Sequence, residues 1–234
     1  MVKGLDVLKE KRPLGPILAG HNECRICHYV GFWANSTSVG HPCPACRRPS
    51  KGGQGFFGES VRALTNVIQS CYHRHCEQQS PSRYKQTNES IVSLVVFCTL
   101  GEVLLEHFLR DLMIALHFLP KVLDRLLEDN LIQKKREEKL FPRLTNEKWK
   151  DAVKLVSLDS GYDFEKVLDF YRKIKDTRNE FLHKGNRFVI TSSMPREILQ
   201  NTAPLLDLFV RLHNRYIHEK IYLKQLQKLG RAES

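Results

Sequence analysis

Apolar residues recur at the spacing of half-buried helices over most of the chain, and this pattern predicts a mainly α fold. A first helix over 58–79 has one apolar face and is broken by the run 78–83. The pattern then predicts helices at about 88–118, 121–135, 145–160, 164–184 and 196–229. Short connections between helices of this length favour an antiparallel bundle.

Residues at the ends of these segments support the assignment. Pro120 stops the helix that begins near residue 88, and Thr145 or Asn146 caps the one that ends near Gly161. The next helix starts after Asp163 and ends at Gly185, since glycine readily closes a helix. The run 134–139 is dense in charge, and we expect it to follow the helix over 121–135 as a charged stretch.

Two of these helices carry a single charge on an otherwise apolar seam. The helix over 88–118 has Glu102 there, and the helix over 164–184 has Arg178. Because an unpaired buried charge costs several kcal/mol, we expect these two opposite charges to meet. Their pair is either a buried bridge that fixes helix register or part of a polar pocket in which the arginine binds phosphate.

The amino-terminal part of the chain, residues 21–57, has a different pattern. Its cysteines form two Cys-x2-Cys pairs separated by fifteen residues, Cys24 with Cys27 and Cys43 with Cys46. Two matched pairs favour one tetrahedral zinc ion over redox chemistry, and four thiolates leave no open position for a substrate. We therefore expect a zinc ribbon with one structural Zn²⁺.

Basic and aromatic residues accompany these pairs. The second pair is followed by Arg47, Arg48 and Lys51, whose charges can bind the phosphates of nucleic acid. The aromatic residues Phe32 and Trp33 can stack on its bases. The alternative is that the two aromatic residues form the small core of the ribbon. A separate cluster, Cys71-Tyr-His-Arg-His-Cys76, has no partner pair, so free thiols are favoured there over a second zinc.

Composition narrows the class of protein. The chain has 234 residues, 41% of them hydrophobic, which suffices for one sizeable core and a small satellite domain. We expect a ribbon at 21–57, a connecting helix and linker at 58–87 and a helical bundle at 88–229. The formal net charge of +11 favours an anionic partner, first nucleic acid and second an acidic membrane, although a solvated basic face gives the same excess.

Cysteine usage and apolar runs indicate the compartment. Seven cysteines, an odd number, and an amino terminus without an apolar stretch predict a reducing compartment, and we expect a cytoplasmic protein. The most apolar stretch is free of charge only over 91–101, which is far short of the ~20 residues of a membrane span. It predicts a buried helix and no membrane partner.

The run from Arg178 to Gly185 carries the candidate chemistry. Arg178 can neutralise charge on a phosphorane, and His183 can take a proton from a ribose 2′-hydroxyl or give one to a leaving 5′-oxygen. Asn179 precedes His183 by one helical turn, and Lys175 is a further candidate cation for RNA. Arg178 and His183 lie ~140° apart around an ideal helix, so a two-fold dimer is needed to aim both at one atom. The alternative role of His183 is a capping cation.

Arg178-Asn179-x3-His183, with the helix that leads into it, resembles the motif of the HEPN ribonucleases. The resemblance covers about residues 88–229. It implies a helical bundle, a homodimer with one composite cleft and metal-independent RNA cleavage with a 2′,3′-cyclic phosphate product. Arg178 and His183 would be catalytic, Asn179 the supporting polar residue, and Glu102 the acidic partner, with Glu106 as the fallback. The Tyr that some toxin members carry two residues after the His is Gly185 here.

Members of that family serve in toxin–antitoxin pairs and phage defence, so the resemblance also implies RNA as substrate and an antitoxin or another protein as partner. Other members only bind. A non-catalytic adaptor for RNA, nucleotide or protein is therefore the second hypothesis, and a nucleotide sensor is the third. A DNA nuclease is disfavoured because the sequence shows no paired carboxylates for a two-metal site.

Overall fold

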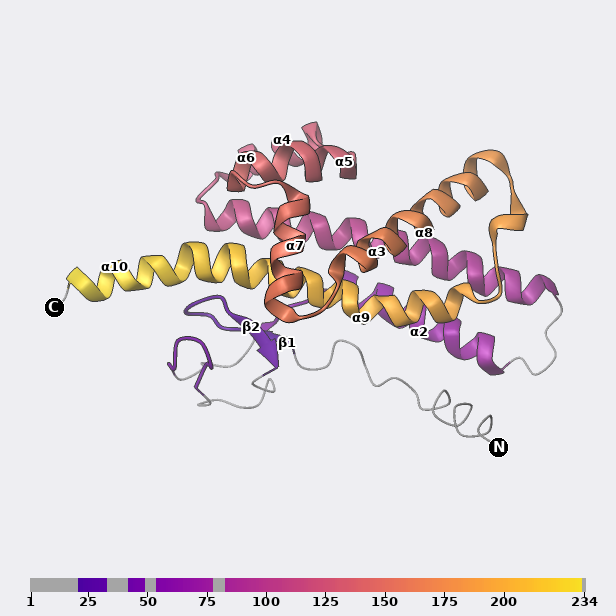
Figure 1. Ribbon diagram of the computed structural model, residues 1–234, viewed down its shortest axis with the longest axis horizontal. Coiled ribbons are helices and arrows are strands. Elements are labelled where there is room, and N and C mark those ends of the chain that lie inside the picture. Colours follow the sequence, from indigo (N-terminus) through magenta and orange to yellow (C-terminus); the bar gives the residue numbers. More distant parts are fainter. Residues whose placement is uncertain (1–20, 33–41, 49–53, 78–82, 233–234) are drawn as a thin grey trace.

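The computed structural model describes residues 21–32, 42–48, 54–77 and 83–232. As the pattern predicts, the protein is mainly helical, with a small amino-terminal sheet and a cluster of four cysteines beside a helical bundle (Figure 1). The elements are β1 (His21–Glu23), β2 (Val30–Phe32), β3 (Gln54–Gly55), α2 (Glu59–Glu77), α3 (Arg83–Ala115), α4 (Pro120–Asp129), α5 (Gln133–Lys135), the π-helix η1 (Arg136–Leu140), α6 (Phe141–Thr145), α7 (Trp149–Ser160), α8 (Phe164–Lys184), the 3-10 turn η2 (Arg187–Val189), α9 (Met194–His213), the π-helix η3 (Asn214–Leu223) and α10 (Lys224–Ala232).

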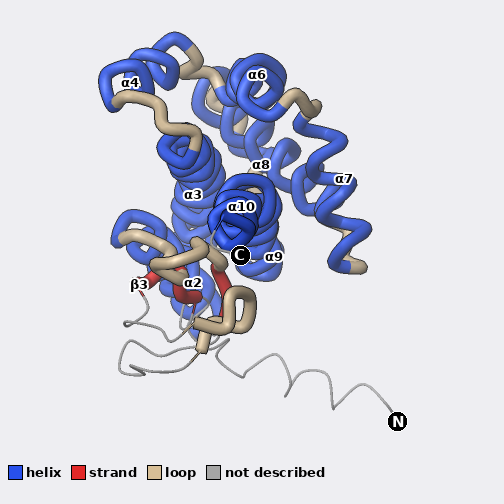
Figure 2. Tube along the Cα trace, turned by 90° about the vertical axis from the view of Figure 1, so that its left-hand side faces the viewer, coloured by secondary structure: helices blue, strands red, loops and turns tan. Residues whose placement is uncertain are grey.

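Helix α3 lies at the centre of the bundle, packed against α2, α8 and α9 (Figure 2). Among the described residues it is the one helix long and apolar enough, over Asn88–Ala115, to cross a membrane by length and composition. Half of its most apolar stretch is buried inside the protein, in agreement with the expected buried helix. Helix α2, expected as a connector, adds Val61 and Ile68 to the same core.

The prediction of one continuous helix over 121–135 is wrong for the second half of this range. Helix α4 ends at Asp129, and Asn130 turns the chain while its amide Nδ2 donates to the carbonyl oxygen of Leu126 (2.9 Å). The charged run 134–139 is itself helical, and Arg136 within it is buried. The guanidinium of Arg136 donates to the carbonyl oxygen of Asn130 (3.0 Å) and to Glu106 (3.0 Å). These two acceptors explain how the arginine is accommodated inside the protein.

The cap expected at Thr145 is also wrong. The Thr145 hydroxyl donates to the carbonyl oxygen of Phe141 (2.9 Å), so Thr145 ends α6, and Asn146 follows in the left-handed region at φ 59°. Helix α7 therefore begins only at Trp149.

The bounds of α8 are confirmed. Asp163 caps its start by accepting from the backbone N–H of Lys166 (3.2 Å), and Gly185 closes its end at φ 65°. The last long helix is confirmed as a continuous run from Met194 to Ala232, but its middle, η3, has π geometry.

The small sheet has the order β2-β1-β3, and both pairs are antiparallel. It lies against the junction of α9 and η3, while α10 extends beyond it (Figure 1). Asn214 holds β2 there, since its amide accepts from the N–H of Val30 and donates to the carbonyl oxygen of the same residue, both at 2.8 Å. One side chain thus occupies the place of a neighbouring strand at this edge.

Replacing Gly101 with alanine should destabilise the fold by about 1–3 kcal/mol, because the new methyl group would overlap the buried ring of Tyr171. The ring cannot swing away without losing the hydrogen bond from its hydroxyl to the carbonyl oxygen of Cys98 (3.1 Å). Urea denaturation measures the loss. Gly58→Ala is the control, since its methyl group would meet only a His107 carbon at 3.8 Å. Equal stability of both variants would contradict the packing described.

Candidate functional site

The four expected cysteine ligands come together. Cys24 Sγ lies 3.9 Å from Cys46 Sγ, Cys27 Sγ lies 3.8 Å from Cys43 Sγ, and all four sulfurs lie within 4.8 Å of one another. In a tetrahedral thiolate site with metal–sulfur bonds of about 2.3 Å, neighbouring sulfurs are about 3.8 Å apart. The cluster therefore has the size and the donor set of a metal site.

The two Cys-x2-Cys turns share one backbone geometry. The carbonyl oxygen of Cys24 accepts from the N–H of His28, and that of Cys43 accepts from the N–H of Arg47, both at 2.8 Å. His28 and Arg47, each directly after the second cysteine of its pair, adopt φ values of 58° and 60°. Burial raises the pKa of the Cys27 thiol, so four thiolates this close need a cation among them.

The first of these turns is bound to the carboxyl-terminal helix. The carbonyl oxygen of Cys27 accepts from Nδ1 of His218 (2.6 Å), and that of His28 accepts from Nε2 of His213 (3.0 Å). The His28 ring stacks on Tyr222 with centroids 3.9 Å apart. Burial lowers the pKa of His213 to about 4, so its imidazole is neutral at pH 7 and keeps its donor role.

The candidate nucleic-acid residues of the ribbon are only partly described. Arg47 and Arg48 are exposed beside the second cysteine pair, and neither has an ion-pair partner among the described residues. Lys51 and Trp33 lie outside the described residues, and Phe32 lies in β2 without a described side chain.

The second cysteine cluster lies in the last turns of α2. Cys71 is buried and Cys76 is exposed, and the four ribbon cysteines are the only group with metal-ligand spacing in the part of the chain that the structure describes. That this second cluster holds free thiols stays a prediction.

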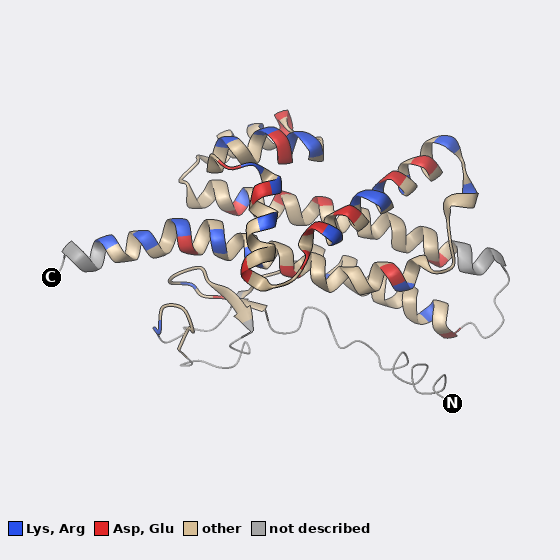
Figure 3. Cartoon of the chain, viewed as in Figure 1, with Lys and Arg blue, Asp and Glu red and all other residues tan. Residues whose placement is uncertain are grey.

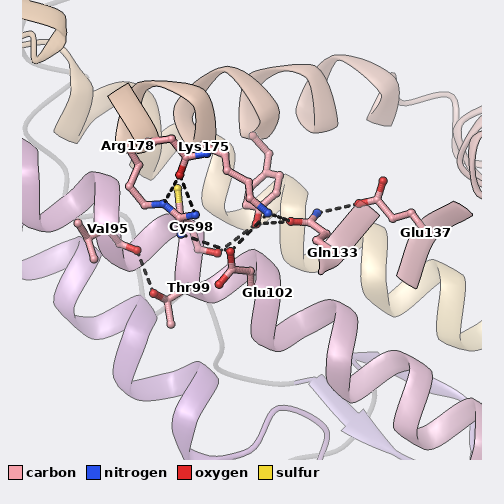
Figure 4. Close-up of polar contacts among 10 residues, drawn as sticks. Val95, Cys98, Thr99, Glu102, Gln133, Glu137, Lys175 and Arg178 are labelled. Carbon is pink, nitrogen blue, oxygen red and sulfur yellow. Dashed lines mark hydrogen bonds and ion pairs between the residues drawn. The ribbon is translucent and has the colours of Figure 1, made fainter. Parts of the chain in front are cut away.

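The second candidate site is the pair of seam charges, and they meet as expected. Nη1 of Arg178 on α8 lies 3.3 Å from Oε1 of Glu102 on α3 (Figure 4). The Arg178 side chain is 18% exposed and that of Glu102 is 40% exposed. The pair is therefore half-open, which favours a pocket over a closed bridge that only fixes register.

Lys175 shares the same carboxylate. Its Nζ lies 3.4 Å from Oε1 of Glu102 and 2.6 Å from Oε1 of Gln133, which also accepts from the hydroxyl of Tyr171 (3.1 Å). Nε2 of Gln133 donates to Glu137 (2.7 Å; Figure 4). Two cations thus face one carboxylate, and a chain of hydrogen bonds fixes the lysine.

Glu102, Gln133, Lys175 and Arg178 line a pocket of about 420 Å³ between α3, α5 and α8. Its charged lining residues are Arg136, Lys175, Arg178, Glu102 and Glu106. Cations outnumber carboxylates, so the pocket can take a compact anion. Glu106, the fallback partner of Arg178, pairs instead with Arg136 at 3.0 Å.

Sequence reasoning missed Gln133 and Arg136. Both enter the pocket because the chain turns at Asn130, and the helical pattern over 121–135 gave no sign of that turn. The dense charge of 134–139 was the one available signal, since an arginine with apolar neighbours on a helix face can be buried.

His183 lies apart from this pocket. It is exposed near the end of α8, it does not line the pocket, and it has no hydrogen-bond or ion-pair partner among the described residues. The amide oxygen of Asn179 accepts from Nη2 of Arg178 (3.2 Å), so Asn179 orients the guanidinium and not the imidazole. The structure therefore brings together Arg178, Asn179, Glu102 and Lys175 and leaves His183 on another face of the helix.

Charged residues of both signs recur along the length of α8 (Figure 3). No family model, no curated protein and no solved structure matches the chain in comparisons of all three kinds.

Proposed function

We propose that this protein is a metal-independent RNA endonuclease of the HEPN type. The observation that carries the proposal is the half-open pocket in which Glu102 and Asn179 hold Arg178 beside Lys175. An arginine oriented by two acceptors at a concave, cation-rich surface is suited to an RNA phosphate, because its fork of donors matches phosphate oxygens.

In the proposed reaction the ribose 2′-oxygen attacks the adjacent phosphorus and the bond to the 5′-oxygen breaks. Arg178 and Lys175 neutralise the charge that develops on the phosphorane oxygens. His183 takes the 2′-hydroxyl proton or delivers a proton to the departing 5′-oxygen. The products are a 2′,3′-cyclic phosphate and a free 5′-hydroxyl, and water is not consumed.

A homodimer is part of the proposal. His183 is exposed while Arg178 faces the pocket, so one chain does not direct both groups at one phosphate. A second chain related by a two-fold axis can bring its His183 to the Arg178 side of the first. The Arg178 of one chain and the His183 of the other then act on one phosphate.

For the four-cysteine cluster we propose a zinc ion held by Cys24, Cys27, Cys43 and Cys46. Four thiolates at tetrahedral spacing are the donor set that Zn²⁺ prefers. Zinc in a closed site contributes folding energy, and here it would fix the turn that carries His28 against the carboxyl-terminal helix.

The purified protein should cleave single-stranded RNA or tRNA in EDTA and leave 2′,3′-cyclic phosphate ends. An oligonucleotide of the same sequence with 2′-deoxyribose should not be cleaved, because it lacks the 2′-hydroxyl that attacks the phosphorus. End analysis of the products by mass spectrometry measures this outcome, and His183→Ala prepared in parallel is the control for contaminating nuclease. Binding of RNA without any cleavage would favour the adaptor hypothesis, and equal cleavage by both proteins would contradict the proposed site.

A further inference from the structure

An exposed aromatic residue stands just after the motif helix. Phe188 is 90% exposed, more than any other large hydrophobic residue that the structure describes as exposed. It lies in η2, the turn that follows the carboxyl end of α8. A single exposed apolar residue is common on a protein surface, so the setting of the ring decides whether it binds a partner.

The turn that carries Phe188 is held firmly. Gly185 closes α8, and the side chain of Asn186 accepts from the N–H of Phe188 (3.1 Å) while it donates to Glu180 on α8 (2.7 Å). Ile190, just beyond the turn, packs against the core. The ring is therefore presented by an anchored backbone, which lowers the entropy lost when a partner binds it.

Positively charged residues precede this ring in the sequence. Lys184 and Arg187 are exposed, and neither they nor His183 has an ion-pair partner in the described part of the chain. The nearest acid along the chain, Glu180, already accepts a hydrogen bond from Asn186. An exposed aromatic ring among unpaired cations is the combination that binds single-stranded nucleic acid, by stacking on a base and neutralising its phosphates.

We propose that Phe188 stacks on an unpaired base of single-stranded RNA, while Lys184 and Arg187 bind the neighbouring phosphates. This inference deepens the proposed function and rests on it, because it places the base next to the nucleotide that His183 would act on. It makes a single-stranded region the substrate, since a base within a duplex has no free face for the ring.

The test is equilibrium binding of a fluorescein-labelled, uncleavable 2′-O-methyl RNA of mixed sequence to the full-length protein. Phe188→Ala should weaken binding about 5- to 150-fold, as loss of one stacked base does. Phe188→Trp should restore binding and Phe188→Leu should not, because leucine keeps apolar area but has no π-face. Leu158→Ala, at an exposed apolar position on α7, should bind like wild type.

The salt dependence of the RNA affinity distinguishes the contribution of base stacking from that of charge. Phe188→Ala should leave the slope of log affinity against log salt unchanged, whereas Arg187→Ala should reduce it by about 0.7. Unchanged affinity of Phe188→Ala would overturn the inference. So would a shift of Phe188→Ala from dimer to monomer in sedimentation, because the ring would then belong to an interface between two copies.

The binding assay and the cleavage assay test the stacking role and the proposed function independently. If wild type cleaves RNA and Phe188→Ala binds and cleaves equally well, the inference fails and the proposed function stands. If wild type binds RNA through Phe188 but cleaves none, the proposed function fails and the stacking role stands. A wild type that neither binds nor cleaves single-stranded RNA overturns both.

Discussion

With the proposed zinc ion in the four-cysteine cluster, replacing Cys27 with serine should remove that ion and release the ribbon from the carboxyl-terminal helix. Serine is a poor ligand for a soft metal site, and three thiolates hold the ion far less tightly than four. Cys27 also binds the helix directly, since its carbonyl oxygen accepts from His218. We expect the metal content to fall from one ion per chain to background, and the ribbon to lose most of the roughly 10–16 kcal/mol that a structural zinc supplies.

The helices should survive this change, because the cysteines form a small cluster separate from the main core. Circular dichroism should therefore show nearly unchanged helix content. Hydrogen exchange reports the release, since the N–H of Val30 is bonded to Asn214 and should lose protection. Elemental analysis measures the metal.

Cys76→Ser is the matched control for this experiment, because Cys76 is exposed and lies outside the cluster. It should keep the metal and the protection of Val30. A wild type that carries no metal, or a Cys27→Ser protein that retains both metal and protection, would contradict the assignment of these cysteines.

Local patterns in the sequence were sufficient for much of the fold. Gly161 and Gly185 end helices where the pattern places them, and both adopt the positive φ that favours glycine. The lone charges Glu102 and Arg178 could be paired because each stood on an apolar seam, and burial leaves an isolated charge without water. The ion pair between Glu102 and Arg178, which joins two helices far apart in the sequence, could therefore be predicted from the local pattern alone.

Contacts made by polar side chains across the fold could not be predicted in this way. The turn at Asn130 depends on an amide that bonds back to its own helix, and the burial of Arg136 depends on Glu106 from another helix. Asn214 completes the edge of β2 from far along the chain. Such pairs leave no periodic signal, because each uses one polar residue that fits a solvated helix face equally well.

Helical geometry did predict the separation within the motif. The spacing of Arg178 and His183 places them ~140° apart, and the structure has the arginine in the pocket and the histidine in solvent. His183 stands in the last turn of α8, so the alternative role of a capping cation also fits its position. The exposed imidazole remains available to a second chain or to RNA.

Arg178→Lys should reduce RNA cleavage about 100- to 1,000-fold, the usual effect of removing one positioned donor to a developing oxyanion. Lysine keeps the charge but lacks the planar fork that reaches Glu102 and Asn179 together. Initial cleavage rates with saturating RNA measure the loss. Arg172→Lys is the matched control, since Arg172 lies on the same helix, is half-exposed and does not line the pocket. Equal rates for the two variants would remove Arg178 from the reaction.

Mixing Arg178→Lys protein with His183→Ala protein then tests whether two chains share one site. In a dimer whose cleft takes the arginine from one chain and the histidine from the other, each mixed dimer has one cleft with both groups intact. Cleavage in the mixture should therefore exceed that of either variant alone. If every site lay within one chain, no mixed dimer could recover activity. The separation of Arg178 and His183 on α8 favours recovery, because neither chain by itself presents both groups on one face.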